Sequence, residues 1–368
     1  MEILPGYLLL EMLLGAGAAL ACLWLLEKQE RKAGGKNAFA QGHGSQAGGK
    51  KERLAFFDFA KGAAIIGVIC VHAGTLASWG EPVKEAFGFA LPVFILCSGY
   101  LLSRRYAGKL ELGAYFQSVF YRIALVYFIF VLALHFLHNG LTLDPAGVAL
   151  DLLLGRTDNG SYYFIPLMLQ LYLIFPILRK NGAALCTAGL IAAWCLSLYF
   201  EYQTWLWQTP AWNSNPLANA FAGRYFFFFV LGMRLSKFDF EAMKAKTSAI
   251  LAGIFLSSAA LLGALNNSVY LGYLFQLGVF FTMHAIFKSG KSMLDRIRLA
   301  GALEALGKNS LAIYMIHASI IFGLLARIPY GWEGVGGYAL LVALSTAISY
   351  AAARAFMAAY ARMTAGFR

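Results

Sequence analysis

Charged residues are scarce in this chain: they make up 13% of its 368 residues, while hydrophobic residues make up 60%. A soluble domain has about 25% charged and about 45–50% apolar residues. The apolar excess falls in long runs separated by short polar segments, and about 20 apolar residues in a helix cross the ~30 Å hydrocarbon core of a bilayer. The composition therefore excludes a soluble dinucleotide-binding enzyme, a secreted domain and a nucleic-acid-binding protein.

Cysteines and ligand-binding motifs are also few. The five cysteines lie in apolar runs without CxxC spacing, which indicates packing residues instead of a disulfide or zinc framework. They are Cys22, Cys70, Cys97, Cys186 and Cys195. No glycine-rich phosphate loop and no internal repeat is visible. His135 and His138 have a spacing compatible with metal ligation, but no third ligand is evident, so we expect no metal site.

What the chain does contain is eleven apolar segments that predict membrane-spanning helices. We therefore expect an all-α, polytopic membrane bundle, with a body of about ten helices and one extra N-terminal transmembrane helix. The predicted spans cover residues 7–26, 60–79, 86–103, 115–137, 161–178, 183–200, 222–236, 248–265, 269–287, 309–326 and 337–358.

Lys and Arg are distributed asymmetrically between the segments that connect these spans. If the N-terminus is outside, 25 of the 30 basic residues lie on the inner side. The positive-inside rule thus predicts an outer N-terminus and a cytoplasmic C-terminus. The net charge of +12 reflects this topology, with attraction to anionic membrane lipid, and does not indicate nucleic acid.

Composition divides the chain into three regions. Residues 1–26 are predicted to form a transmembrane anchor, and residues 27–52 a flexible basic cytoplasmic linker, because they are rich in Gly, Gln and Lys and lack an apolar period. Residues 53–368 form the membrane domain. The loops of this domain are short, so any chemistry must take place within the bundle or at its face.

Ionisable side chains inside a bilayer are costly and mark functional sites. On the first helix of the body, Asp58 and Lys61 are three residues apart and can form an ion pair. Lys61 and His72 are eleven residues apart, which places them on one helix face with His72 about 16 Å deeper. Neutral imidazole can take and return a proton near neutral pH. The alternatives are structural roles: a hydrogen bond from His72 to a neighbouring helix, and a position of Lys61 at the membrane interface.

Other polar residues in or beside the spans are interpreted more simply. His284 and His317 lie in apolar helices, where a histidine is typically a hydrogen-bonding residue between helices. Arg224 and Arg327 lie at outer ends of spans and are expected at the membrane interface, where either could meet an anionic glycan carrier. The Trp-rich segment 201–221 favours an aromatic belt, with a sugar-stacking platform as the alternative.

The segment from Lys61 to His72 fits a Lys/Arg-x10-His pattern, and five further segments follow it in order. They are LPVFILCSGYLLSRRY, FYRIALVYF, SYYFIPLMLQLYLIFPIL, RYFFFFVLGMRLS and LGKNSLAIYMIHASI. In this order and spacing the chain resembles the acyltransferase-3 family of membrane acyltransferases over about residues 53–360. The resemblance implies a bacterial inner-membrane enzyme that moves an acyl group, usually acetyl, from cytoplasmic acyl-CoA to a hydroxyl of an envelope glycan or lipid-linked sugar.

The resemblance also implies roles for individual residues. His72 matches the essential histidine, Lys61 its basic partner and Asp58 the acidic position before them, so these three are the expected catalytic residues. Binding of acyl-CoA or substrate is expected at Ser98, Arg104, Arg105, Arg122, Tyr163 and His317. No bound cofactor is expected, because acetyl-CoA is a donor substrate.

The chain departs from the family pattern at two places. Near the third helix of the body, the paired basic residues of the family pattern are reduced to Arg122, with Gln117 and Ser118 at positions where more charge is usual. At the start of the fifth predicted span, residues 161–164 have the sequence SYYF and lack a histidine that the family pattern has there. The alternative function is a transporter or flippase of a lipid-linked sugar or small metabolite; the absence of an internal two-fold repeat argues against it. Sequence leaves open the acceptor, the acyl group and the oligomeric state.

Overall fold

The computed structural model is built from helices: every regular element in the described part of the chain is helical. The structure describes residues 3–32, 54–140, 142, 144–155, 161–182, 186–206, 219–238, 240, 242–266, 272–328 and 331–364. The α-helices are α1 (Ile3–Lys32), α2 (Ala55–Leu76), α3 (Gly80–Phe87), α4 (Ala90–Arg105), α5 (Leu112–Val119), α6 (Leu125–Asn139), α7 (Pro145–Leu154), α9 (Phe164–Lys180), α10 (Thr187–Leu206), α12 (Phe226–Leu235), α13 (Ala245–Asn266), α14 (Gly272–Arg296), α15 (Leu299–Lys308), α16 (Ser310–Ala318) and α17 (Gly334–Thr364). Shorter helical turns are η1 (Phe120–Ala124), η3 (Ala222–Tyr225), η4 (Ser319–Leu324) and η5 (Leu325–Arg327).

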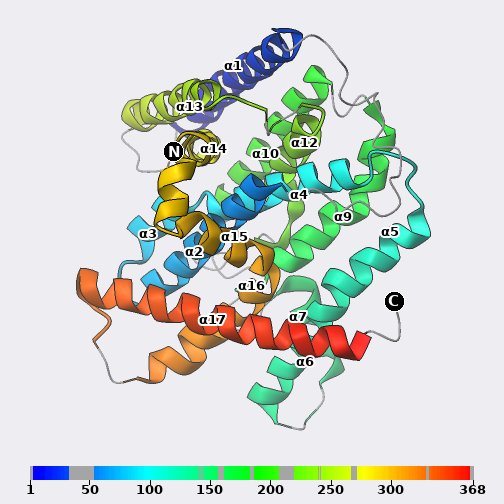
Figure 1. The fold of residues 1–368 in the computed structure, drawn as a ribbon, viewed down its shortest axis with the longest axis vertical. Coiled ribbons are helices and arrows are strands. Elements are labelled where there is room, and N and C mark those ends of the chain that lie inside the picture. Colours follow the sequence, from blue (N-terminus) through cyan, green and yellow to red (C-terminus); the bar gives the residue numbers. More distant parts are fainter. Residues whose placement is uncertain are drawn as a thin grey trace.

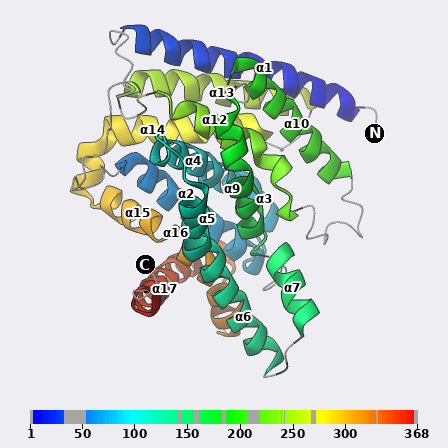
Figure 2. The same ribbon diagram turned by 90° about the vertical axis from the view of Figure 1, so that its right-hand side faces the viewer.

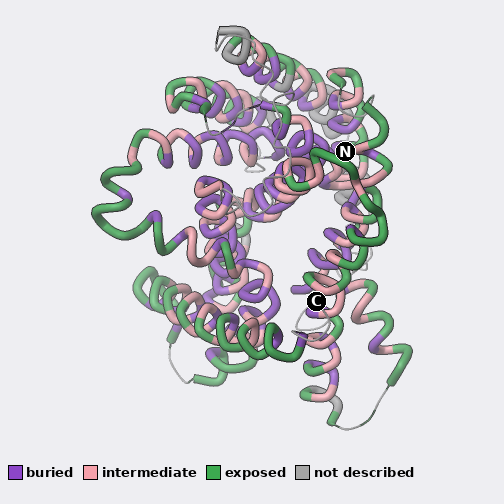
Figure 3. Tube along the Cα trace, turned by 45° about the vertical axis from the view of Figure 1, so that its right-hand side comes forward, coloured by how far each residue is buried: buried purple, intermediate pink, exposed green. Residues whose placement is uncertain are grey.

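The helices stack around α2, which lies in the middle of the bundle (Figure 1). At one end of the molecule α1, α13 and α14 lie one above the other, and α17 lies at the opposite end (Figures 1 and 2). Between these layers α2 contacts α3, α4, α15, α16 and α17. The buried residues concentrate along α2 and the helices around it, whereas α17 has a largely exposed outer face (Figure 3).

Six helical segments in the described residues are long and apolar enough to cross a membrane. They are Ala55–Leu76, Pro82–Arg105, Leu112–Leu137, Ala245–Ala264, Ser310–Arg327 and Gly334–Thr364. These confirm six of the predicted spans and the polytopic all-helical fold. The other five predicted spans are helices too (α1, α9, α10, η3 with α12, and α14), but they are not among these six. Helix α9, for example, has 17 residues and ends in Arg179 and Lys180.

Two predicted boundaries differ from the structure. Residues 288–308, which separate the predicted spans 269–287 and 309–326, are almost entirely helical, because α14 continues to Arg296 and α15 follows at once. Helix α1 runs on to Lys32, and the rest of the predicted linker, residues 33–52, lies outside the described residues, as does the centre of the Trp-rich segment, residues 207–218.

Glycine allows two pairs of helices to pack backbone against backbone. A Cβ atom on Gly62 of α2 would lie 1.9 Å from the carbonyl oxygen of Leu303, and one on Gly307 of α15 would lie 1.8 Å from that of Asp58. Likewise, Gly99 of α4 and Gly232 of α12 each face the backbone of the other helix. Small residues allow this close approach in membrane bundles. The contact with α15 fixes the position of the α2 turn that carries Asp58.

Candidate functional site

The first turns of α2 carry the ion pair that the sequence predicted. Lys61 Nζ lies 2.9 Å from Asp58 Oδ1, and the two side chains are 20% and 14% exposed. Asp58 lies in the first turn of α2, where a carboxylate interacts favourably with the helix dipole. Cys97 of α4 is close enough to interact electrostatically with both charges. The pair therefore lies between α2 and α4, at the wall of a cavity.

This cavity has a volume of about 270 Å³ and is bounded by α2, α4, α5, η1, α9 and α16. Four of the predicted site residues line it: Lys61, Ser98, Arg105 and Arg122. The remaining lining residues are Phe94, Leu101, Leu102, Tyr106, Ser118, Val119, Ile123, Phe164, Ile165, Met168, Tyr172, Ser310, Leu311 and Tyr314. Among the described lining residues there are three cations and no carboxylate, so the cavity favours an anionic ligand.

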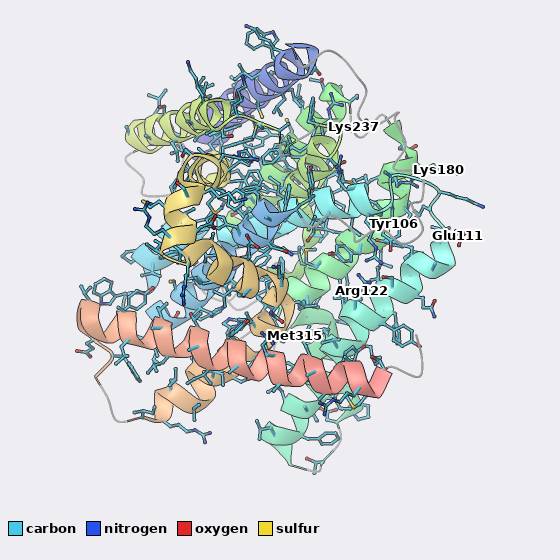
Figure 4. All side chains as sticks on the ribbon, in the orientation of Figure 1. Tyr106, Glu111, Arg122, Lys180, Lys237 and Met315 are labelled. Atoms are coloured by element: carbon cyan, nitrogen blue, oxygen red, sulfur yellow. The ribbon has the colours of Figure 1, made fainter. Side chains whose placement is uncertain are left out.

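Arg105 and Arg122 bring guanidinium groups to the cavity from two different helices. Arg105 is at the end of α4, and its Nη2 donates to Ser118 Oγ at 3.4 Å. Arg122 lies in η1, a π-helical turn between α5 and α6, and such turns are common at functional sites. Figure 4 shows Arg122 on this helix and Tyr106 at the end of α4. Arg105 thus supplies, from α4, a second cation next to Ser118, one of the two positions where the resemblance led us to expect more charge.

The cavity changes in character along α4. The lining residues Arg105, Leu101, Ser98 and Phe94 are three or four residues apart on one helix face, so the cavity follows the helix for about 16 Å. Its polar end holds Arg105, and Ser98 is hydrogen-bonded to Tyr172. Its other end is aromatic, because the rings of Phe94 and Phe164 are 5.8 Å apart. A ligand with an anionic head and an apolar arm fits this gradient.

His72 lies beyond the aromatic end and does not line the cavity. Its ring centre is 5.0 Å from that of His317 on α16, and 6.0 Å from that of Phe322 in η4. His317 in turn lies 5.4 Å from the ring of Tyr314, which lines the cavity. Aromatic rings therefore connect the cavity to His72, which is partly exposed.

Besides His317, two predicted binding residues lie off the cavity. Arg104 is beside Arg105 in sequence, but it is not among the residues that line the cavity. Tyr163 also lies off the cavity and interacts electrostatically with Tyr225, Arg224 and Glu201. Its neighbour Phe164 lines the cavity instead, because successive residues at the start of α9 point in different directions.

The sequence reasoning missed a partly buried polar cluster around Arg224. Arg224, which we expected at the membrane interface, forms two hydrogen bonds with Glu201 of α10, at 2.6 and 3.0 Å. Tyr273 of α14 donates to the backbone oxygen of Arg224 and, at 3.5 Å, to Glu201. Glu201 ends an apolar run, so an inventory of every carboxylate near a span would have identified it.

Replacing Glu201 with alanine is expected to lower the unfolding free energy by about 3 kcal/mol, because the guanidinium of Arg224, only 12% exposed, would lose its carboxylate partner. Glu201→Gln retains a hydrogen-bond acceptor and should cost less. Thermal unfolding of the detergent-solubilised protein measures both. Equal stability of the alanine variant and the wild type would contradict this role of the pair.

The remaining polar residues have structural partners. His284 Nδ1 is 2.7 Å from the Ser248 hydroxyl, and the backbone N–H of Asp144 donates to His135 Nε2 at 3.5 Å; the side chain of His138 lies outside the described residues. Cys22, Cys70 and Cys97 are buried as predicted, whereas Cys186 is exposed because it precedes the first turn of α10. Within the described residues, no three His, Cys, Asp or Glu side chains form a potential metal site.

Comparison with known proteins identifies the family. No curated protein and no solved structure gave a significant match to the chain. The acyltransferase-3 family model, described as an acyltransferase domain, matches residues 54–354, which is the body from α2 into α17 and excludes α1. This range contains the Asp58–Lys61 ion pair, the residues that line the cavity, and the neighbouring His72 and His317. The chain therefore belongs to the acyltransferase-3 family and is a multi-pass membrane acyltransferase.

Proposed function

We propose that the protein is an O-acyltransferase of a bacterial inner membrane that transfers an acyl group, most simply acetyl, from cytoplasmic acyl-CoA to a hydroxyl of an envelope glycan or lipid-linked sugar. The observation that carries the proposal is the cavity, with Arg105 and Arg122 at its polar end and aromatic rings at the other. Coenzyme A has the matching form, since its phosphates are anionic and its pantetheine arm is long and narrow.

The charges of the cavity suit the phosphates of the donor. Guanidinium groups bind phosphate with two parallel hydrogen bonds, and Arg105 and Arg122 approach the cavity from different helices. Asp58 orients Lys61 through the 2.9 Å ion pair. The hydroxyl groups of Ser98, Ser118 and the tyrosines provide further donors along the arm. With the phosphates at this end, the thioester points toward Tyr314 and, beyond it, the two histidines.

Acyl transfer to an alcohol needs a base that takes the hydroxyl proton while the alcohol oxygen attacks the thioester carbon. His72 is our candidate for this base, acting directly or through a transient acyl-imidazole. The arginines are at one end of the cavity, and His72 lies beyond the other end. The donor phosphates and the acceptor hydroxyl would therefore bind at separate places. This separation is what transfer from one side of a membrane to the other requires.

The test uses the purified full-length chain in lipid nanodiscs with acetyl-CoA and an envelope glycan fraction. We expect release of free CoA thiol and appearance of acetylated glycan by mass spectrometry. In the absence of acceptor, exchange of label between acetyl-CoA and free CoA would indicate the acyl-imidazole route. If no label is exchanged, the result would indicate direct base catalysis. A protein that accumulates a lipid-linked sugar in vesicles without consuming acetyl-CoA would be a transporter, and the proposal would be wrong.

Arg105→Ala and Arg122→Ala are each expected to raise the KM for acetyl-CoA about tenfold and to leave kcat within about twofold, because a lost phosphate contact weakens ground-state and transition-state binding equally. Arg104→Ala should have a smaller effect on KM, since Arg104 does not line the cavity. Steady-state kinetics of the three variants measure this order. A KM effect of Arg104→Ala as large as that of Arg105→Ala would place the phosphates elsewhere.

A further inference from the structure

His317 is fully buried on α16, and only one of its ring nitrogens is satisfied. Its Nδ1 lies 2.6 Å from the backbone oxygen of Tyr314, one turn earlier in the helix. Its Nε2 is buried and has no hydrogen-bond partner among the described residues. A buried nitrogen without a partner costs free energy, so it calls for an explanation.

The protonation of the ring follows from these contacts. A carbonyl oxygen can only accept, so Nδ1 of His317 must carry a proton and donate it. In the neutral ring, Nε2 then has a lone pair and can only accept. The partner that Nε2 lacks must therefore be a donor.

The ring of His72 is the ionisable group placed to be that donor. The two ring centres are 5.0 Å apart, with 51° between the ring planes, so the rings are neighbours tilted against each other. His72 is on α2 and His317 on α16, two helices that pack together.

We infer that His317 is a positioning residue for His72: Nε2 of His317 accepts a hydrogen bond from one ring N–H of His72 and leaves the other His72 nitrogen with its lone pair toward the reacting groups. This inference rests on the proposed role of His72 as the base. It gives His317 a role through His72, in place of the direct contact with substrate that the resemblance implies.

The hydrogen bond has a defined part in the transfer. The acceptor hydroxyl gives its proton to the free nitrogen of His72 while its oxygen bonds to the acyl carbon and the carbon–sulfur bond breaks. His72 is then an imidazolium, and its other N–H donates more strongly to Nε2 of His317. The imidazolium returns the proton to the CoA thiolate, which leaves as the thiol, and both histidines are neutral again.

His317→Phe and His317→Gln separate this role from packing. Phenylalanine keeps a ring but has no acceptor, and we expect kcat with acetyl-CoA and the glycan fraction to fall about 100-fold while the KM for acetyl-CoA changes less than about twofold. Glutamine has an amide oxygen that can accept from His72, so we expect it to retain at least about a third of the wild-type kcat. Equal losses in the two variants, or a normal kcat in His317→Phe, would overturn the inference.

Nitrogen-15 spectra of histidine-labelled protein give a readout that does not depend on turnover. We expect His72, assigned by its loss in His72→Gln, to show one protonated and one unprotonated nitrogen in the wild type and in His317→Gln, and averaged tautomers in His317→Phe. Averaged tautomers in the wild type would overturn the inference even if the protein did not consume acetyl-CoA. A wild type that never releases CoA would contradict the proposed function alone.

His284→Phe is the matched control. His284 is also fully buried, with Nδ1 next to the Ser248 hydroxyl and Nε2 without a partner in the described part of the chain, but its ring neighbours are Phe56 and Phe240. We expect its substitution to leave kcat and the His72 spectrum unchanged. A 100-fold lower kcat in this variant would show that loss of any buried histidine slows the enzyme, and would remove the evidence for a specific His317 effect.

Discussion

Replacing His72 with glutamine is expected to lower the rate of acyl transfer by about 10³-fold or more, with the protein still folded in the membrane. General base catalysis contributes roughly 10²–10⁴-fold, so the loss of the base accounts for an effect of this size. Glutamine is similar in size and cannot take the hydroxyl proton. Release of CoA thiol from acetyl-CoA in the presence of the glycan fraction measures the loss.

Two further measurements make the His72→Gln result specific. Binding of acetyl-CoA should be retained, because the cavity that holds Arg105 and Arg122 does not include His72. The thermal unfolding midpoint should change little, because glutamine is similar in size to histidine and His72 is partly exposed. Normal turnover in this variant would remove His72 from the mechanism, and a collapse of stability would mean that its role is to hold α2 and α16 together.

The part of the site that lies on α2 could be predicted from the sequence, because helix geometry alone relates its residues. The spacing of Asp58 and Lys61 predicted their ion pair, and the structure contains it. The eleven-residue spacing placed His72 about three turns beyond Lys61. Local periodicity was sufficient for these relations, since α2 is regular from Ala55 to Leu76.

Contacts between distant segments could not be predicted in this way. The hydrogen bond of Arg105 to Ser118 joins two helices, and the contact of His72 with His317 joins residues 245 positions apart, which no periodicity encodes. Helix α15 lies between two predicted spans and was not predicted, because it is only ten residues long and too short to cross a membrane. Its backbone contact with α2 explains why an amphipathic segment there is helical.

The backbone contact between α15 and α2 leads to the second prediction with a large expected effect. Gly307→Ala is expected to lower the unfolding free energy by about 2 kcal/mol or more, because a Cβ atom there would lie 1.8 Å from the backbone oxygen of Asp58, and overpacking of this kind costs about 1–3 kcal/mol. The neighbouring backbone cannot move like a flexible side chain, so α15 must shift away from α2. Because Asp58 holds Lys61, we also expect slower acyl transfer. Thermal unfolding and CoA release measure the two effects.

Gly301→Ala on the same helix isolates the steric cause. Gly301 is exposed, and a Cβ atom there would meet nothing within 4 Å. Alanine favours a helix over glycine by up to about 1 kcal/mol, so this variant should be as stable as the wild type or slightly more stable. Alanine gives the same gain in helix propensity at position 307, so the cost of the clash there must exceed this gain for the variant to be less stable. If both variants were equally stable, α15 would not pack backbone to backbone against α2, and the position of the Asp58–Lys61 pair would have to be set by other contacts.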